Sequence, residues 1–254
     1  MNDILKLIIP LMKSSGDLAK DQLHNNKKII EKPNDDIVTD VDLKIEKMIT
    51  SFLLKEFPDF GILSEETVKV KSNSEYIWIL DPIDGSKHYH SGLPFYSISL
   101  ALKHLNEICL GAVYSPDTGE FFYAVKNHGA YLNEMKIKCK KDQQLKDSLV
   151  CVEIPSRHFS DSQIDSSFAK VKKIIKNCKR IRIIGTSALG LSYCALGGFG
   201  AYVNLSLSSK EWDLAAGEII VKEAGGVVSM VDNIIIAGPN NIHDNIIQIL
   251  ELRG

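Results

Sequence analysis

An apolar run that ends in two acidic residues is the feature that most constrains how this chain can fold. Residues 76–80 (Tyr-Ile-Trp-Ile-Leu) have the composition of a buried strand, and residues 81–86 (Asp-Pro-Ile-Asp-Gly-Ser) follow directly. The carboxylates of Asp81 and Asp84 repel each other unless a cation lies between them, and Mg²⁺ prefers oxygen ligands of this kind. The Gly-Ser turn offers backbone N–H groups to an anion if a helix begins there. The sequence therefore predicts a metal site beside an anion site, an arrangement suited to chemistry on a phosphate group.

The bulk composition excludes several classes of protein. The chain has 254 residues, which suit one large domain or two closely packed subdomains. Its net charge of −2 provides no basic surface for nucleic acid, and no apolar run is long enough for a membrane span. The five cysteines are scattered without a C-x-x-C pair, and the N-terminus lacks the pattern of a signal peptide. We therefore expect a cytoplasmic protein with reduced thiols and with no nucleic-acid or membrane partner.

The first part of the chain, residues 1–145, predicts helices followed by an antiparallel sheet. Apolar spacing predicts a helix over residues 3–27, kinked or split near Pro10 or Gly16, and a second helix from about residue 39 to 53. Alternating and apolar runs separated by turn signals predict strands at residues 76–80, 95–102, 108–114 and 121–125. The polar, Lys-rich residues 138–147 then predict a subdomain boundary.

The second part, residues 146–254, alternates strands with helices. Strands are predicted at residues 149–154, 180–184, 201–205, 227–231 and 234–237. Helices are predicted around residues 168–175, at 187–196, at 212–224 and from about residue 243. This alternation favours a layered α/β half. The fold class is therefore α/β in the mixed α+β sense, with an antiparallel-sheet half followed by a smaller α/β half.

Each candidate acid also has an ordinary structural explanation. Asp42 lies three residues after Thr39, as in a helix capping box, and Asp213 falls in the first turn of a predicted helix. Glu65 and its acidic neighbour Glu66 could form a solvated loop. Asp81 and Asp84 could likewise cap a helix start, but the buried strand before them makes that explanation weaker.

The order and spacing of the motifs resemble the inositol monophosphatase superfamily along essentially the whole chain. The matching motifs are Glu65-Glu66, residues 81–86, residues 212–217 and residues 223–226, with residues 38–42 and 185–188 at further family site positions. The resemblance implies a layered αβαβα sugar-phosphatase fold and a Mg²⁺-dependent, Li⁺-sensitive phosphomonoesterase that forms a homodimer. Inositol 1-phosphate is the leading substrate, with fructose 1,6-bisphosphate and 3′-phosphoadenosine 5′-phosphate as alternatives. A non-catalytic binding protein of the same fold is a more remote alternative.

The resemblance also implies roles for individual residues. Two or three Mg²⁺ ions would be held by Glu65, Asp81, the carbonyl of Ile83, Asp84 and Asp213. The attacking water would be oriented by Asp42, Glu65 and Ser86. The phosphate would be bound by the N–H groups of Gly85 and Ser86, and substrate hydroxyls by Asp84, Gly185, Thr186 and Ser187.

Several positions depart from the family pattern. The family usually has Thr where this chain has Ser86, and it has Asn-Phe where this chain has His88 and Tyr89. His88 and His90 fall in a polar turn region, residues 86–92, and we expect them at the rim of the site rather than as metal ligands. Lys87 resembles the nucleotide-bisphosphate branch, whereas residues 92–95 resemble the inositol and sugar-phosphate branch. Residues 203–211 contain no clear counterpart of the acid that contacts inositol hydroxyls. The sequence therefore leaves the branch and the substrate open.

Overall fold

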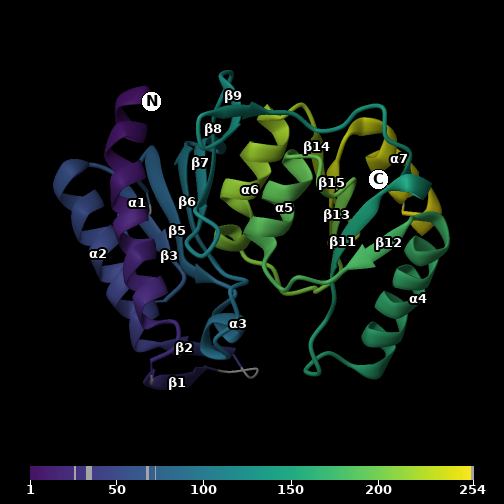
Figure 1. Cartoon of the computed structure of the whole chain (residues 1–254), viewed down its shortest axis with the longest axis horizontal. Helices are drawn as coiled ribbons and strands as arrows, with labels where there is room; N and C mark the ends of the chain where they lie inside the picture. Colours follow the sequence, from purple (N-terminus) through teal and green to yellow (C-terminus); the bar gives the residue numbers. More distant parts are fainter. Residues whose placement is uncertain (26, 33–35, 67–68, 72, 253–254) are drawn as a thin grey trace.

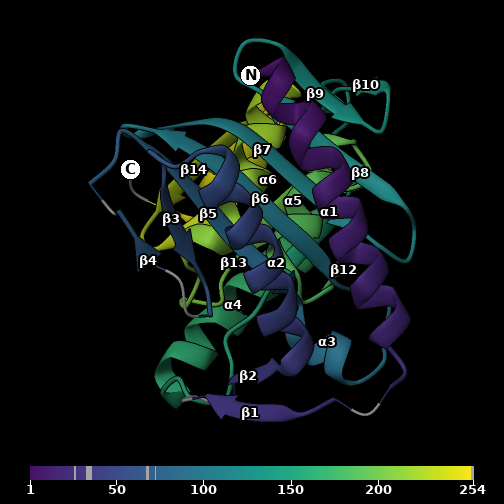
Figure 2. The same ribbon diagram turned by 90° about the vertical axis from the view of Figure 1, so that its left-hand side faces the viewer.

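The computed structural model describes residues 1–25, 27–32, 36–66, 69–71 and 73–252. Five layers follow one another across the molecule in Figure 1. Helices α1 (Asn2–Gln22) and α2 (Asp40–Glu56) cover the outer face of a first sheet, as Figure 2 shows from the side. Helices α5 (Ser187–Ala195) and α6 (Glu211–Glu223) lie between this sheet and a second one. Helices α4 (Asp161–Asn177) and α7 (Asn240–Leu250) cover the far face, so the predicted layered α/β fold is confirmed.

The first sheet has eight strands in the order β10-β9-β8-β7-β6-β5-β3-β4. Their bounds are β3 (Gly61–Ser64), β4 (Lys69–Val70), β5 (Tyr76–Asp84), β6 (Ser97–His104), β7 (Glu107–Ser115), β8 (Glu120–Val125), β9 (Gly129–Leu132) and β10 (Met135–Ile137). All neighbours pair antiparallel except β3 and β5, which run parallel. Strands β1 (Ile29–Lys32) and β2 (Asp36–Thr39) form a separate antiparallel pair that leads into α2.

The second sheet has five strands in the order β12-β11-β13-β15-β14. Their bounds are β11 (Leu149–Glu153), β12 (Arg180–Arg182), β13 (Ala201–Asn204), β14 (Val227–Val231) and β15 (Ile234–Gly238). Strand β11 runs parallel to both β12 and β13, whereas β15 pairs antiparallel with β13 and β14. The carboxyl ends of β11 and β13 therefore point the same way, which is where ligands bind in parallel sheets.

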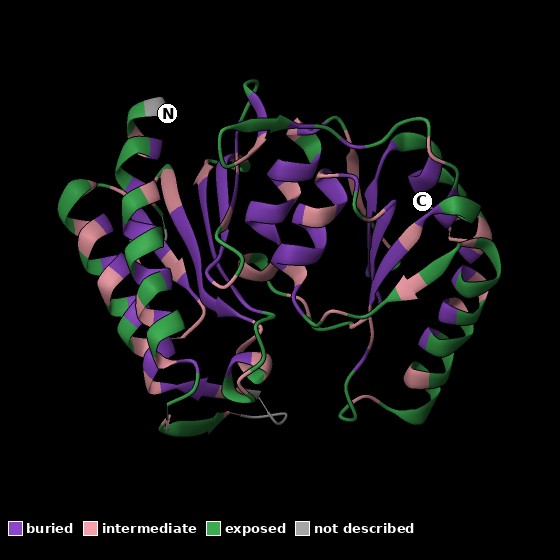
Figure 3. Ribbon diagram, in the orientation of Figure 1, coloured by how far each residue is buried: buried purple, intermediate pink, exposed green. Residues whose placement is uncertain are grey.

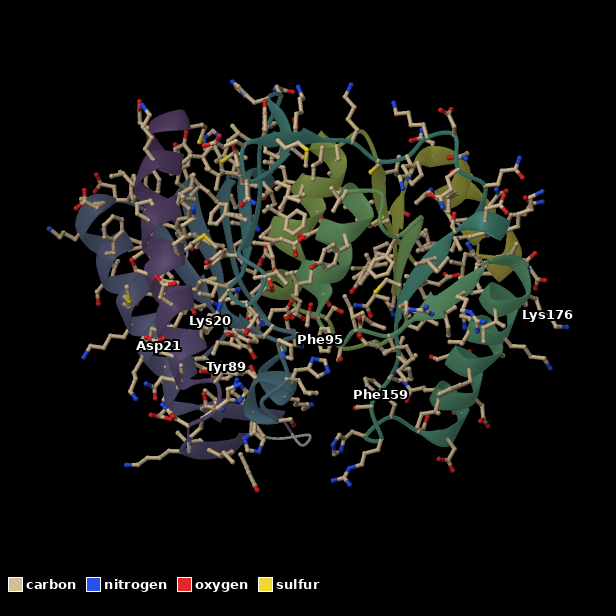
Figure 4. All side chains as sticks on the ribbon, in the orientation of Figure 1. Lys20, Asp21, Tyr89, Phe95, Phe159 and Lys176 are labelled. Carbon is tan, nitrogen blue, oxygen red and sulfur yellow. The ribbon has the colours of Figure 1, made fainter. Side chains whose placement is uncertain are left out.

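Two short helices complete the described elements. Helix α3 (Ser86–His90) follows β5 directly, and a 3₁₀ turn, Leu145–Asp147, precedes β11. Tyr89 of α3 is buried and donates a hydrogen bond of 2.8 Å to the carbonyl of Ala19, so it ties α3 to the end of α1 (Figure 4). Residues 86–92 are therefore not only the polar turn that the sequence suggested, because their first part is helical.

Close packing holds α6 against the first sheet. Figure 3 shows the buried faces of α5 and α6 and of both sheets, which form the middle of the molecule. A Cβ atom at Gly111 of β7 would lie 2.7 Å from the carbonyl oxygen of Ala216 and 2.9 Å from its Cα. A Cβ at Gly217 would lie 2.6 Å from the Cβ of Leu191 in α5. Glycine at these two places lets α6 approach both neighbours, and this contact positions the start of α6.

The structure also differs from the sequence-based expectations at α1, at β9 and β10, and at the last helix. Helix α1 is continuous through Pro10 and Gly16, and Gly16 has a packing role because a Cβ there would lie 2.4 Å from the ring of Tyr114. Strands β9 and β10 were not expected, since they are short and carry exposed polar residues around the turn at Asn133. The last helix begins at Asn240, before the expected His243. The division into residues 1–145 and 146–254 stays a prediction.

Candidate active site

A cavity of about 290 Å³ collects most of the predicted site residues. It lies where β5 ends and α3, α5 and α6 begin, between the two sheets (Figure 1). Its lining includes Glu65, Asp81, Ile83, Asp84, Gly85, Ser86, Gly185, Ser187 and Asp213. Asp42 lies behind this lining and reaches it through Ser86, whereas the buried side chain of Thr186 does not line the cavity.

Asp81 and Asp84 are buried at the end of β5, where the pairing with β6 shifts register between them. Oδ2 of Asp84 accepts hydrogen bonds from the N–H of Ala188 at 2.9 Å and from Oγ of Ser97 at 3.4 Å. Oδ1 of Asp81 is buried and has no hydrogen-bond partner among the described residues. Burial and then the neighbouring carboxylate of Glu65 raise the pKa of Asp81 well above its usual range. An ionised Asp81 therefore lacks the partner that a buried carboxylate needs.

A hydroxyl group is fixed between an acid and a carbonyl at the start of α3. Oγ of Ser86 lies 3.1 Å from Oδ1 of Asp42 and 2.8 Å from the carbonyl oxygen of Ile83. Oδ2 of Asp42 accepts hydrogen bonds from the N–H of Thr39 at 3.0 Å and from the Thr39 hydroxyl, which completes a capping box. Burial raises the pKa of Asp42. The helix-cap explanation for Asp42 is therefore correct, and the same carboxylate also contacts Ser86 with its other oxygen.

Gly85 occupies a position that no other residue fits. Its φ of +94° is in the left-handed region. A Cβ atom there would lie 2.7 Å from the carbonyl oxygen of Phe95 and 2.9 Å from Cγ2 of Thr186. The chain can therefore turn sharply from β5 into α3 and leave the backbone beside the cavity bare of side-chain atoms.

Lys32 is a site residue that the sequence analysis missed. Its Nζ lies 3.2 Å from Oε1 of Glu65 and 2.6 Å from Oε2 of Glu66. Burial raises the pKa of Glu66 to about 7, although the hydrogen bond from Lys32 opposes this shift. Glu66 is therefore not a solvated loop residue, and the ammonium group offsets part of the negative charge at this wall.

Asp213 is the third residue of α6. Its Oδ2 accepts a hydrogen bond of 2.7 Å from the N–H of Lys210, so it caps the helix as its position predicted. The carbonyl of the preceding residue, Trp212, accepts a hydrogen bond of 3.5 Å from the hydroxyl of Ser99 on β6. The start of α6 is thus anchored to the first sheet, and Asp213 lines the same cavity as Glu65.

The oxygen atoms that line the cavity suit a hard cation, although the acidic side chains are not arranged around a single ion in this structure. In the part of the chain that the structure describes, no three or more His, Cys, Asp or Glu side chains are placed so that they could hold a metal ion. Glu65 is paired with Lys32, and Asp84 and Asp213 accept from backbone N–H groups. The available donors are carboxylate and carbonyl oxygens, which Mg²⁺ prefers. The unpartnered Oδ1 of Asp81 is the atom that most clearly fits such an ion.

The sequence analysis also missed Glu153 and Asn204, although their positions at the ends of predicted strands could have identified them. They end β11 and β13, lie opposite each other in the parallel register, and both line the cavity. Oε1 of Glu153 accepts a hydrogen bond of 3.2 Å from the N–H of Gly185. Burial raises the pKa of Glu153 to about 7. Both strands were predicted, so the rule that ligands bind at the carboxyl ends of parallel strands would have found these residues.

A wider cavity of about 710 Å³ adjoins the first and shares Glu65, Lys87 and Asp213 with it. It is also lined by Lys32, His158, Phe159, Lys210 and Trp212. Figure 4 shows Phe159 on the loop between β11 and α4. His88 and His90 line neither cavity: Nδ1 of His88 lies 3.1 Å from the carbonyl of Phe95, and His90 is exposed. None of the helices in the described ranges contains an apolar segment of the length that a bilayer requires.

Comparison with known proteins identifies relatives over nearly the whole chain. Residues 1–246 match the Inositol monophosphatase family. The chain is 35% identical to the fructose-1,6-bisphosphatase/inositol-1-monophosphatase of Aquifex aeolicus, with 93% of this chain and 90% of that protein covered. It is 32% identical to Nus factor SuhB of Haemophilus influenzae, with 91% and 86% covered. The crystal structure of extragenic suppressor protein suhB from Bartonella henselae superposes with a TM-score of 0.92 at 27% identity, covering 98% of each chain. This chain therefore belongs to the inositol monophosphatase family and is a phosphatase.

Proposed function

We propose that this phosphatase is a Mg²⁺-dependent hydrolase of small phosphorylated polyols and that inositol 1-phosphate is its leading substrate. One observation carries the proposal. Glu65, Asp81, Asp84 and Asp213, which come from three separate segments, line the same cavity as Ser86. So many acids around one polar cavity are costly unless cations and an anionic substrate bind there.

The metal ligands in this proposal are Glu65, Asp81, the carbonyl of Ile83, Asp84 and Asp213. Bound Mg²⁺ supplies positive charge against the ester oxygens and the leaving group, and it lowers the pKa of a bound water. The carbonyl oxygen of Ile83 has two lone pairs, so it can accept from Ser86 and still serve as a ligand. An IMPase/NADP phosphatase of the same fold, 24% identical to this chain, was crystallised with Mg²⁺ and phosphate. We further propose two or three ions and inhibition by Li⁺.

The chain's own residues would activate the water. When the hydroxyl of Ser86 turns from the carbonyl of Ile83 to donate its proton to Oδ1 of Asp42, a lone pair of Oγ can accept a hydrogen bond from a water in the cavity. That water is thereby oriented with its oxygen toward the phosphorus. Its proton can pass to Oγ of Ser86 while the Ser86 proton passes to Asp42, whose raised pKa makes it a better base. Glu65 at the same cavity would accept a second hydrogen bond from the water.

The phosphate and the leaving group would bind to different residues of the cavity. We assign the phosphate to the backbone N–H groups of Gly85 and Ser86, where the bare backbone admits close approach. Asp84, Gly185 and Ser187 also line the cavity and would contact hydroxyls of the leaving group. Thr186 would act only through its backbone, because its side chain is buried.

The wider cavity favours a second candidate class. Lys32, Lys87 and Lys210 bring positive charge to it, and Phe159 and Trp212 bring aromatic surface. A substrate with a further anionic group, such as fructose 1,6-bisphosphate or 3′-phosphoadenosine 5′-phosphate, could place that group there. Phosphate release from the three compounds at saturating Mg²⁺ ranks these candidates. We expect inositol 1-phosphate to give the highest kcat/KM, and no release from any of the three would contradict the proposal.

We also propose that the protein is a cytoplasmic homodimer. The five cysteines are free thiols, which agrees with a reducing compartment. Leu93, Phe95 and Ile183 are large apolar residues with 44%, 52% and 51% exposure, and such surface is typical of an interface. Light scattering on the purified protein measures the mass directly, and a monomer at micromolar concentration would exclude the dimer.

A further inference from the structure

Glu153 and Asn204 form a wall of the cavity that the proposed reaction leaves without a role. They are register partners at the carboxyl ends of β11 and β13. Ser187 of α5 and Ser206 and Ser209 of the loop after β13 line the cavity as well. The wall lies on the second sheet, whereas the phosphate-binding turn at Gly85 follows a strand of the first sheet. A molecule whose phosphate sits at Gly85 therefore presents its remaining part to Glu153 and its neighbours.

The amide of Asn204 is used within the protein. Its Nδ2 lies 2.8 Å from Oη of Tyr202 and 2.8 Å from Oγ of Ser209, and its Oδ1 accepts a hydrogen bond of 2.8 Å from the N–H of Ser206. The contacts with Ser206 and Ser209 fix the loop between β13 and α6. Asn204 thus shapes the wall and has little hydrogen-bonding capacity left for a ligand.

The contacts around Tyr202 give Ser187 a defined direction. Tyr202 accepts a hydrogen bond from Asn204, so it donates its own proton to Oγ of Ser187 at 2.9 Å. Ser187 must then donate its proton to another acceptor, and it lines the cavity. The relay from Asn204 through Tyr202 therefore makes Ser187 a hydrogen-bond donor toward the cavity.

Glu153 supplies the matching acceptor. Oε1 accepts a hydrogen bond of 3.2 Å from the N–H of Gly185 and a weak one of 4.0 Å from the thiol of Cys151, and a carboxylate can accept about four. Glu153 and Ser187 together present one acceptor group and one donor group. A hydroxyl both donates and accepts, so it satisfies both of them, whereas a phosphate or carboxylate only accepts and would be repelled by Glu153.

We propose that Glu153 is a specificity-determining residue that accepts a hydrogen bond from a hydroxyl of the leaving group. It selects phosphate esters of polyols and rejects an anionic group at this wall of the cavity. A second anionic group could enter only the wider cavity near Lys87 and Lys210. This inference rests on the proposed phosphomonoesterase function and identifies a residue that binds the leaving group.

The test compares two substrates with Glu153→Gln. Glutamine keeps the size of the side chain, and its carbonyl oxygen can still accept from Gly185, so the fold should be retained. Inositol 1-phosphate carries hydroxyls on its leaving group, and phenyl phosphate carries none. Because a hydrogen bond to a charged acceptor is lost, we expect KM for inositol 1-phosphate to rise by about 10-fold or more. Both kcat and KM for phenyl phosphate should change by less than about 2-fold.

Glu223→Gln is a matched control. The Glu223 carboxylate also accepts backbone hydrogen bonds, from Asn127 and Gly129 at 2.8 Å each, but it does not line the cavity. This variant should leave the ratio of the two KM values unchanged. Ser187→Ala is a second variant, which removes the donor and should raise KM for inositol 1-phosphate several-fold while sparing phenyl phosphate.

The outcomes separate this inference from the proposed function. If Glu153→Gln and Ser187→Ala alter both substrates equally, or neither, the role of Glu153 is refuted while the phosphomonoesterase stands. A wild type that hydrolyses phenyl phosphate but no hydroxylated ester refutes it in the same way. If the wild type with Mg²⁺ releases phosphate from neither compound, the proposed function itself is wrong.

Discussion

Ser86 and Asp42 are 44 residues apart in sequence, yet Oγ of Ser86 lies 3.1 Å from Oδ1 of Asp42. The contact joins the start of α3 to the start of α2. The second oxygen of Asp42 is held by Thr39, so the carboxylate has a fixed orientation. A hydroxyl group placed in this way can orient a water and pass its proton to a base.

Replacement of Ser86 by alanine should therefore reduce turnover more than binding. We expect Ser86→Ala to lower kcat by about 10²-fold or more, with a small change in KM, because it removes the proton path to Asp42. Ser86→Thr keeps the hydroxyl and should retain most of the activity. Steady-state phosphate release with Mg²⁺ measures both values, and an unchanged kcat in Ser86→Ala would exclude the proposed path.

Asp81 should limit the stability of the metal-free protein. Its buried Oδ1 has no partner among the described residues, so an amide in its place removes a buried charge. We expect Asp81→Asn to raise the free energy of unfolding without metal by about 1–3 kcal/mol and to lose nearly all activity. It should also lose most of the stabilisation that Mg²⁺ gives the wild type. Thermal unfolding with and without Mg²⁺ measures this, and a less stable metal-free variant would contradict the account.

Lys32 should compete with metal at Glu65. In Lys32→Met the charges of Glu65 and Glu66 lose their cation, so the metal-free protein should lose about 1 kcal/mol or more of stability. The apparent affinity for Mg²⁺ should increase, because the cavity becomes more negative. Isothermal titration with Mg²⁺ measures the affinity.

Lys44→Met is the control for Lys32, because Lys44 forms an exposed pair with Asp40 on the surface of α2. It should change neither stability nor Mg²⁺ affinity by more than a few tenths of a kcal/mol. Equal effects of the two substitutions would show that the location of Lys32 is irrelevant.

Glu153 should make stability depend on pH. Its pKa is raised from the ordinary 4.5 to about 7 in the folded protein, so the folded state binds the proton more tightly than the unfolded chain. Stability therefore falls as pH rises from about 4.5 to 7, and the cost persists above that. Glu153→Gln removes this term, and its stability relative to the wild type should rise across that window by up to about 3 kcal/mol. Asp84 also faces Glu153 and is present in both proteins, and burial keeps the pKa values of the neighbouring Tyr202 and Cys151 well above this pH window. Urea unfolding at pH 4.5 and 7.5 measures the difference, which a pH-independent gap would contradict.

Local patterns predicted the parts of the site that are close in sequence. The apolar residues before Asp81 indicated a buried strand, and β5 indeed delivers Asp81 and Asp84 to the cavity. Thr39 and Asp42 were recognised as a capping box from their spacing, and the box is present. The assignment of Glu65 and Asp213 to the same site came from the family resemblance, because no local pattern joins such distant residues.

Contacts between distant segments could not be predicted from the sequence. Lys32 contacts Glu65 across 33 residues, and its place depends on how β1 lies beside the first sheet. A basic residue in a polar stretch carries no signal of such a pair. The continuity of α1 through Gly16 depends on Tyr114 of β7, whose ring fills the space beside the glycine. The role of Asn204 also depends on partners that only the folded loop supplies.

The most direct test of the account is phosphate release from inositol 1-phosphate as Mg²⁺ is titrated into metal-free protein. We predict release that saturates with Mg²⁺, stops on addition of EDTA and is nearly absent in Asp81→Asn and Asp213→Asn. Release that persists in EDTA, or in either variant at saturating Mg²⁺, would contradict the claim that these carboxylates hold the catalytic metal.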